Sequence, residues 1–107
     1  MLKRAPSWDE VRAELPQNVQ DRLNEKRARR RIGEALAELR KKAELTQAAV
    51  GSGAEIPQGN VSRMEKSDDM LLSSISRYMR AIGGSVEVVL KGADGRAVHV
   101  EVDPLKS

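Results

Sequence analysis

The spacing of apolar residues changes near Ser85, and this change divides the chain into a helical part and a short β part. Before it, apolar residues recur at helical intervals, as between Ile75 and Ile82. After it, residues 85–91 and 97–103 alternate apolar and polar side chains, which predicts two strands. We therefore expect a mainly α protein that ends in a β-hairpin.

The dipeptide Asp94-Gly95 lies between the two alternating segments and is a strong hairpin signal. A two-residue turn there would place Leu90 opposite His99 and break the apolar pattern. A three-residue loop, 93–95 with Gly95 in the left-handed conformation, keeps the pattern, and we predict it. The pairs that follow are Leu90 with Val98, Val88 with Val100, and Val86 with Val102.

The hairpin needs a partner, because two strands alone are marginally stable in water. The rest of the chain offers a small core, since Trp8 and Tyr78 are the only aromatic residues among 107. A second copy of the chain is the obvious source of further packing, so we expect a homodimer. Residues 85–107 are the expected dimerisation segment.

Several functional classes are not expected from the composition. The chain has no cysteine, which leaves no disulfide, zinc ribbon or thiol nucleophile and suits a reducing cytoplasm. His99 is the only histidine and is expected to be an ordinary strand residue, with no metal site. No apolar run approaches a membrane span of about 18 residues, and residues 1–6 lack the apolar core of a signal peptide. We expect no enzyme activity, no cofactor and no membrane association.

The first 31 residues form an expected N-terminal helical extension. Ser7 and Glu10 have the spacing of a capping box, in which each side chain bonds the other's backbone N–H. Trp8, Val11 and Leu15 follow at helical spacing before a proline ends the helix. A helix this short is not stable alone, so it docks either on its own domain or on a partner.

A long second helix is expected from Asn18 to Ala43, and it contains a basic run at 26–31. Residues 1–31 carry 9 basic and 5 acidic side chains, so the charge excess of the chain lies here. The basic side chains point all round a helix and cannot bury one face. Two interpretations stay open, a solvated connecting helix and a contact with nucleic-acid phosphates.

Residues 32–84 form the expected central domain of short helices. The first ends near Ala43, and Thr46 caps the next over 47–54. A turn leads to a third over 57–65, and Ser73 is expected to cap a fourth. Two helices of about two turns joined by a tight turn, inside a helical cluster, are the helix-turn-helix plan.

This central segment resembles the lambda-repressor-like helix-turn-helix family, of the XRE or Cro/cI type. The whole layout, with its N-terminal extension and C-terminal hairpin, is most similar to HigA-type antitoxins. The residues that carry the resemblance are Leu39-Arg40, Leu45-Thr46-Gln47, Val50, Ile56, Gln58, Val61-Ser62-Arg63 and Glu65.

The resemblance implies a dimer that reads a palindromic operator in double-stranded DNA with the third short helix in the major groove. Gln or Asn can read adenine and Arg can read guanine, while hydroxyl groups bind phosphates. By the same resemblance Gln47 binds a phosphate and steadies Gln58, and Arg40 and Glu65 form an internal salt bridge. The expected DNA-contact residues are Thr46, Gln47, Gln58, Asn60, Ser62 and Arg63.

Some positions depart from the family pattern. Glu44, Glu55 and Ser67 stand where glycine is usual in the family, so we expect these turns to be rebuilt. Gly51 and Gly53 lie inside an expected helix, where each costs about 1 kcal/mol relative to alanine. We expect the helix over 47–54 to be the weakest part of the domain.

The leading hypothesis is an antitoxin that represses its own operon and neutralises a HigB/RelE-like ribonuclease toxin, as the resemblance implies. It would act in the bacterial or phage-infected cytoplasm, on the nucleoid. The alternatives are a stand-alone phage or chromosomal repressor without a toxin and a protein-interaction module with weakened DNA binding. The expected toxin-contact residues are Trp8, Val11, Arg12 and Leu15.

Overall fold

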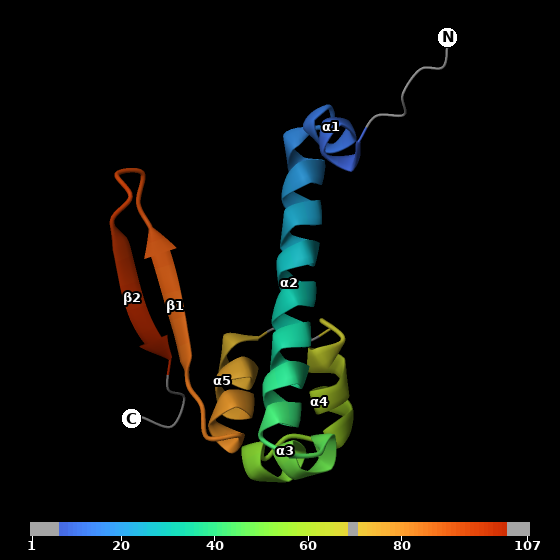
Figure 1. Cartoon of the computed structure of the whole chain (residues 1–107), viewed down its shortest axis with the longest axis vertical. Coiled ribbons are helices and arrows are strands. Elements are labelled where there is room, and N and C mark those ends of the chain that lie inside the picture. Colours follow the sequence, from blue (N-terminus) through green and yellow to red (C-terminus); the bar gives the residue numbers. More distant parts are fainter. Residues whose placement is uncertain (1–6, 69–70, 103–107) are drawn as a thin grey trace.

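The computed structural model describes residues 7–68 and 71–102, and it confirms the mainly α fold with a C-terminal hairpin (Figure 1). Helices α3, α4 and α5 cluster around one end of the long helix α2, and the hairpin stands beside them. The elements are α1 (Trp8–Ala13), α2 (Gln17–Lys42), α3 (Gln47–Ala54), α4 (Gln58–Glu65), α5 (Leu72–Ala81), β1 (Val86–Lys91) and β2 (Ala97–Val102).

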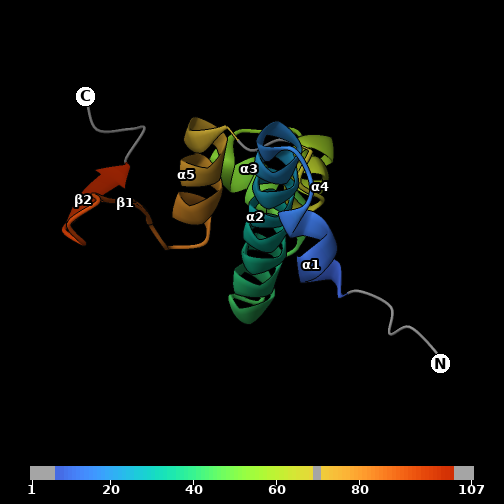
Figure 2. The ribbon, with the colours of Figure 1, turned by 90° about the horizontal axis from the view of Figure 1, so that it is seen from above.

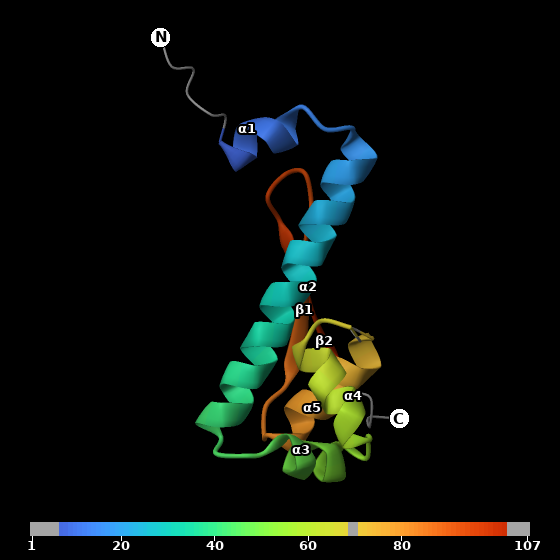
Figure 3. The same cartoon turned by 90° about the vertical axis from the view of Figure 1, so that its right-hand side faces the viewer.

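Helix α2 is the spine of the molecule and agrees with the expected helix to within one residue at each end. It continues without a break through the basic run at 26–31. Its C-terminal half packs in the bundle, and its N-terminal half projects away from it (Figures 1 and 3). Gly33 and Leu36, its two buried residues, mark where it enters the bundle.

The core is small and almost entirely aliphatic, as the composition predicted. One residue from α2, one from α3, two from α4 and one from α5 meet in it, so every bundle helix contributes. The buried cluster is Leu36, Val50, Val61, Met64 and Tyr78. Tyr78 is the only aromatic side chain in this cluster, and its hydroxyl therefore needs hydrogen-bond acceptors.

Helix α1 begins with the predicted capping box. The Ser7 N–H donates to the Glu10 carboxylate at 3.3 Å, and the Glu10 N–H donates to Ser7 Oγ at 3.2 Å. The helix ends at Ala13, so the expectation that it would reach Leu15 is wrong. The residue before a proline is disfavoured in helical conformation, and Leu15 precedes Pro16.

Helix α5 begins earlier than predicted. Leu71, with φ −65° and ψ 133°, is its N-cap, so the expectation that Ser73 would cap the helix is wrong. The Ile75 N–H donates to the Leu71 carbonyl at 3.0 Å, and this bond starts the helix two residues upstream. A serine favours a cap position, but the longer hydrogen-bonded helix is formed instead.

The three turns at non-glycine positions keep the left-handed backbone and are not rebuilt. Glu44 and Glu55 each have φ 59°, and Ser67 has φ 71°. Each such residue costs about 1 kcal/mol relative to glycine. The packing of the helices on either side is sufficient to hold these conformations.

The hairpin has the predicted three-residue loop and register. Gly95 has φ 84°, and β1 pairs with β2 in the order that puts Leu90 beside Val98 and Val88 beside Val100. One face of the hairpin therefore carries an unbroken set of apolar residues, which we call the ladder face. Its members are Val86, Val88, Leu90, Val98, Val100 and Val102.

The two glycines of α3 have different roles. A Cβ on Gly51 would lie 2.8 Å from the Ile56 carbonyl oxygen, closer than real Cβ atoms come. A Cβ on Gly53 would meet Ala81 at 3.4 Å, an ordinary contact. Gly51 is thus required for the close approach of the α3–α4 turn, and only Gly53 weakens the helix.

A matched pair of substitutions tests this difference. Gly53→Ala should raise the free energy of unfolding by about 1 kcal/mol through helix propensity alone. Gly51→Ala should lower it by about 1–2 kcal/mol, because the clash with the backbone outweighs the same gain. Urea unfolding followed by circular dichroism measures both, and equal stabilisation by the two alanines would contradict the assignment.

Candidate nucleic-acid interface

The N-terminus of α3 is open to a bound anion. Thr46 is the N-cap, and its Oγ accepts a hydrogen bond from the Ala49 N–H at 3.1 Å. The first N–H groups of a helix have no partner within the helix and attract negative charge. Thr46 is exposed and Gln47, the first helical residue, is half-buried, so both lie where a phosphate could reach them.

The turn between α3 and α4 holds the second helix at a fixed angle to the first. Glu55 ends α3 in the left-handed conformation, and the Ile56 N–H donates to the Gly51 carbonyl at 2.9 Å. Pro57 is the N-cap of α4, one residue before the helix starts. Val61 and Met64 are buried, so the side of α4 opposite them faces outward.

The outward face of α4 carries most of the predicted DNA-contact residues of this helix. Gln58 and Arg63 are exposed, Ser62 is half-buried, and Gly59 between them leaves open space where a Cβ would be. Lys66, which the sequence analysis did not select, is exposed at the C-cap of α4 on the same face. Its helical spacing from Ser62 and Arg63 was the signal that could have identified it.

Asn60 lies on the opposite flank of α4 from Gln58. Two residues along a helix correspond to about 200° of rotation, so Gln58 and Asn60 occupy opposite flanks of α4. Asn60 is half-buried while Gln58 is exposed. Asn60 stands three residues before Arg63, a spacing that puts two side chains on the same side of a helix, so Asn60 lies nearer to Arg63 than to Gln58.

Glu65 joins α2, α3, α4 and α5 at the end of α4. Arg40 donates to its two carboxylate oxygens from Nε at 2.8 Å and Nη2 at 3.0 Å. The side chains are only 12% and 8% exposed, so this is an internal ion pair. The Tyr78 hydroxyl lies 2.8 Å from the same carboxylate and 2.9 Å from the Leu36 carbonyl, and it can donate to either.

The ionisation of this cluster follows from its contacts. Burial raises the pKa of the Glu65 carboxyl, but the hydrogen bonds from Arg40, Tyr78 and Gln47 outweigh burial and hold that pKa below its usual range. The hydrogen bond to Glu65 raises the pKa of Arg40. Burial, followed by the bond to Glu65, raises the pKa of the Tyr78 hydroxyl. Glu65 and Arg40 are therefore both charged at neutral pH.

Gln47 is held by this cluster. Its Nε2 donates to the Glu65 carboxylate at 3.2 Å, whereas the family resemblance implied that it would steady Gln58. Arg40 also donates to the Leu45 carbonyl at 2.9 Å, just before the α3 N-cap. The cluster thus fixes the start of α3 against the end of α4, and the resemblance to the family did not include Tyr78 in this role.

The basic run of α2 lies beside the C-terminal end of α4. A Cβ on Gly33 would lie 2.7 Å from the Glu65 carbonyl oxygen, so the glycine lets the two helices approach closely. The Ser67 hydroxyl donates to the Arg29 carbonyl at 3.0 Å. A shallow pocket here is lined by Lys26, Arg29, Arg30, Glu34, Glu65, Lys66, Ser67 and Asp68.

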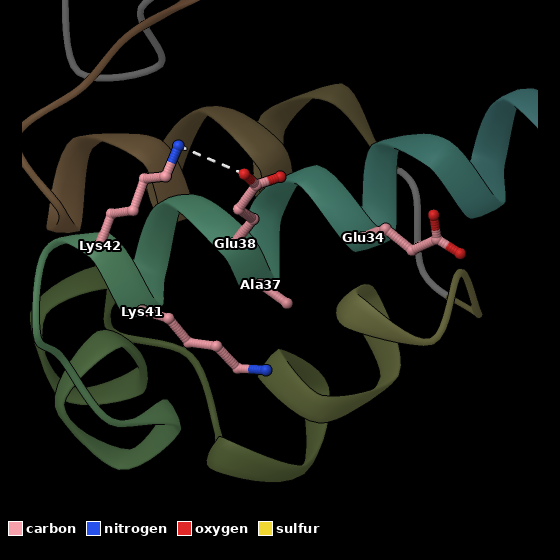
Figure 4. A pocket seen from close by; sticks show the side chains of 5 residues that line it. All are labelled: Glu34, Ala37, Glu38, Lys41 and Lys42. Atoms are coloured by element: carbon pink, nitrogen blue, oxygen red, sulfur yellow. Dashed lines mark ion pairs between the residues drawn. The ribbon is translucent and has the colours of Figure 1, made fainter.

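A second pocket follows the C-terminal half of α2. Figure 4 shows Lys41 extending from α2 toward α4, whereas Lys42 pairs with Glu38 at 3.2 Å. Glu34 and Ala37 complete the lining. Its two acids and two bases balance, so the pocket itself favours neither anions nor cations, but Lys41 adds a positive charge on the α4 side.

The N-terminal extension lies at the far end of α2. Helix α1 folds back toward α2, where Gln20 Nε2 donates to the Leu15 carbonyl at 2.7 Å (Figures 1 and 2). Trp8 is 54% exposed, while Val11 and Leu15 are half-buried. A pocket beside Trp8 is lined by Leu23, Lys26, Arg27 and Arg30. Arg12 belongs to α1, and its side chain lies outside what the structure describes.

The chain matches the family described as "Helix-turn-helix domain" over residues 11–91, about three quarters of its length. It belongs to this helix-turn-helix family. Comparison with curated protein sequences gave no match. Helices α3 and α4 are the two helices of the motif, and α4 is the one whose outward face is free to enter a DNA groove.

The helix-turn-helix domain is a DNA-binding fold, and the basic residues Arg63 and Lys66 are exposed near the C-terminal end of its second helix. Within residues 7–68 and 71–102, no helix combines the length and apolar character of a membrane span. In the same part of the chain, no three His, Cys, Asp or Glu side chains are grouped to hold a metal ion.

Proposed function

We propose that the protein is a sequence-specific transcriptional repressor that inserts α4 into the major groove of its operator. The observation that carries this proposal is the outward face of α4, where Gln58 and Arg63 are exposed on a helix whose opposite side is buried. Gln can bond adenine through two atoms and Arg can do the same with guanine. A regulatory function of this kind needs no catalytic group.

Phosphate contacts would position the helix on the duplex. The capped N-terminus of α3 with Thr46 and Gln47, and the Ser62 hydroxyl on α4, lie on either side of the turn. Such contacts set the register and orientation but carry no sequence information. In this proposal Asn60 contributes from the flank of α4.

The proposed repressor acts as a homodimer on a palindromic operator. Two-fold dimers of such domains read half-sites about one helical turn apart. The hairpin supports this part of the proposal, since half of its ladder face is exposed in the single chain and suited to burial by a second copy.

Fluorescence anisotropy on labelled DNA from upstream of the gene tests base reading. The wild type should bind this DNA more tightly than a scrambled duplex at 200 mM salt. Arg63→Ala and Gln58→Ala should each lose about 1–3 kcal/mol of that discrimination, because each removes one base contact while leaving the phosphate contacts.

Arg77→Ala is the matched control, since Arg77 is an exposed arginine of α5, on the other side of α2 from α4 (Figure 1). It should reduce affinity for both duplexes slightly and equally. Binding that is equal on both duplexes and vanishes with salt would refute the repressor function and favour a protein-interaction module.

A second proposed function, neutralisation of a HigB/RelE-like ribonuclease toxin, rests on the N-terminal extension. Trp8 is more than half exposed and α1 lies away from the bundle, so a partner could bind it without displacing the core. Tyr and Trp are enriched where protein interfaces carry most of their binding energy. Val11, Leu15 and Arg12 belong to the same proposed surface.

Co-expression with the product of the neighbouring gene tests this role. Trp8→Ala should lose capture of a toxin by at least tenfold, a typical effect of removing a central aromatic contact, while operator binding stays unchanged. Full operator binding together with no capture of the neighbouring gene product by the wild type would leave a stand-alone repressor.

A further inference from the structure

The ladder face of the hairpin is covered at one end only. Val86, Val88 and Val102, at the base, are half-buried, and α5 contacts both strands there. Ser76 Oγ donates to the Val102 carbonyl at 2.9 Å. At the tip, Leu90 and Val98 are 60% and 61% exposed. The single chain therefore leaves half of an apolar face in water.

The hydrogen bonds of the hairpin determine which backbone groups of β2 are available to another strand. The Gly92 N–H donates to the Arg96 carbonyl at 2.8 Å, so these two residues form a hydrogen-bonded pair. Along an antiparallel ladder, hydrogen-bonded pairs alternate with pairs that are not hydrogen-bonded to each other. The intervening residues of β2, which are Ala97, His99 and Glu101, must direct their N–H and C=O groups to the outer edge.

We propose that β2 pairs antiparallel with β2 of a second copy about a two-fold axis at Val100, which gives a four-stranded sheet. The proposal rests on the dimer of the proposed function and specifies its interface. In Figure 1, β1 lies on the helix side of the hairpin and β2 on the far side, so the edge of β2 is the accessible one.

This register satisfies two requirements: the apolar side chains lie on one face of the sheet, and the outward backbone groups of the two β2 strands meet. Val100 lies opposite Val100 of the second copy, and Val98 lies opposite Val102, so these three valines of β2 stay on one face. His99 lies opposite Glu101 of the second copy, and both direct their backbone groups to the shared edge. The two ladder faces therefore lie on the same side of the four-stranded sheet and form one continuous apolar face.

The side-chain partners on the outer face favour this axis over the neighbouring one. Within the hairpin, Glu87 lies directly opposite Glu101, and like charges in this position are destabilising. An axis at Val100 places His99 beside each Glu101, whereas an axis at His99 would place the two histidines opposite each other. His99 already contacts Glu87, so in this register it lies between two carboxylates, Glu87 of its own hairpin and Glu101 of the second copy, and can hydrogen-bond to either.

The same register places Val98, at the exposed tip, beside the base of the second hairpin. Antiparallel pairing places the tip of one hairpin beside the base of the other, since Val98 lies opposite Val102 of the second copy. Helix α5 of each copy contacts the base of its own hairpin. Val98 of the second hairpin therefore lies one strand away from Val102, near the α5 that contacts this base, whereas Leu90 lies one strand farther out.

Disulfide cross-linking tests the axis, because the chain contains no cysteine. Val100→Cys places two thiols at a non-hydrogen-bonded pair with Cα atoms about 4.5 Å apart, within the range that a disulfide requires. Val98→Cys alone places them about 13 Å apart, four residues along a strand. The expected result is at least tenfold faster dimer formation for Val100→Cys under mild oxidation.

Two further variants discriminate the alternatives. A mixture of Val98→Cys and Val102→Cys chains should form mixed dimers, since these residues face each other only with the axis at Val100. Val89→Cys reports the edge of β1 and should remain uncross-linked. Cross-linking of Val89→Cys without Val100→Cys, or failure of the mixed pair, would overturn the proposed interface.

Sedimentation of the wild type and fluorescence anisotropy on DNA distinguish a failure of the proposed interface from a failure of the proposed repressor function. A dimer that binds its operator but shows another cross-linking pattern would overturn the register alone. A wild type that sediments as a monomer at tens of micromolar would overturn the interface. DNA binding is read independently in each case, and circular dichroism verifies that each cysteine variant is folded.

Discussion

Glu65→Gln is expected to lower the free energy of unfolding by about 3 kcal/mol, the lower end of the cost of breaking a buried ion pair. The substitution leaves the Arg40 guanidinium almost buried and without its charged partner. It also weakens the bonds from Tyr78 and Gln47, which use the same carboxylate. Urea unfolding at pH 7 measures the loss.

The matched control removes both charges. Arg40→Met combined with Glu65→Leu leaves no unpaired ion, so its cost should be clearly smaller than that of Glu65→Gln. The Tyr78 hydroxyl keeps the Leu36 carbonyl as an acceptor at 2.9 Å in this variant. A single substitution that costs under 1 kcal/mol would show that the ion pair contributes little to the fold.

The same carboxylate predicts an acid-dependent loss of stability. The pKa of Glu65 is lower in the folded chain than in the unfolded chain, so the unfolded chain binds the proton more readily. The contribution is complete above the unfolded pKa of about 4.3 and is lost as pH falls through the folded pKa. Below pH 4.3 the wild type should lose its stability advantage over Glu65→Gln.

The elements that the sequence predicted are those set by local patterns. The capping box at Ser7 and Glu10, the boundaries of α3 and the register of the hairpin follow from spacing within a few residues. The predicted start of α5 was wrong because the prediction preferred Ser73, a favourable cap residue, to a longer helix that begins after Leu71. Local propensity alone cannot decide between these two.

The expectation of rebuilt turns was wrong for a different reason. Glu44, Glu55 and Ser67 adopt the backbone that glycine would favour, and the cost of about 1 kcal/mol each is met by tertiary packing. Gly51 was expected to destabilise the helix, although a Cβ at this position would lie only 2.8 Å from the Ile56 carbonyl oxygen. For Gly51 the deciding contact is the Ile56 carbonyl oxygen in the turn between α3 and α4. How closely that turn approaches the helix cannot be read from a single sequence.

The sequence predicted which residues belong to the candidate site better than it predicted how they are arranged in space. The helical pattern predicted α4, and the family resemblance selected Gln58, Ser62 and Arg63 on it, but the approach of α2 depends on how the helices cross. Gly33 was the one signal of that crossing, since glycine inside a helix often marks close packing. The position of the basic run follows from it.

Replacing Lys26, Arg29 and Arg30 with glutamine is expected to reduce the salt dependence of DNA binding. These residues line a pocket with Lys66 at the end of α4, which favours the phosphate-contact interpretation over a solvated connecting helix. Each phosphate contact contributes about 0.9 to the slope of log affinity against log salt. Loss of three contacts should therefore lower that slope by about 2.7.

The control triple removes the same number of charges from α5 and the hairpin, at Arg77, Lys91 and Arg96. If only total charge mattered, the two triples would change the slope equally. Phosphate contact by α2 requires a much larger change from Lys26, Arg29 and Arg30, together with unchanged preference between operator and scrambled DNA. Since phosphates carry no sequence information, affinity would fall while discrimination by Gln58 and Arg63 remained, and an unchanged slope would leave α2 as a solvated connecting helix.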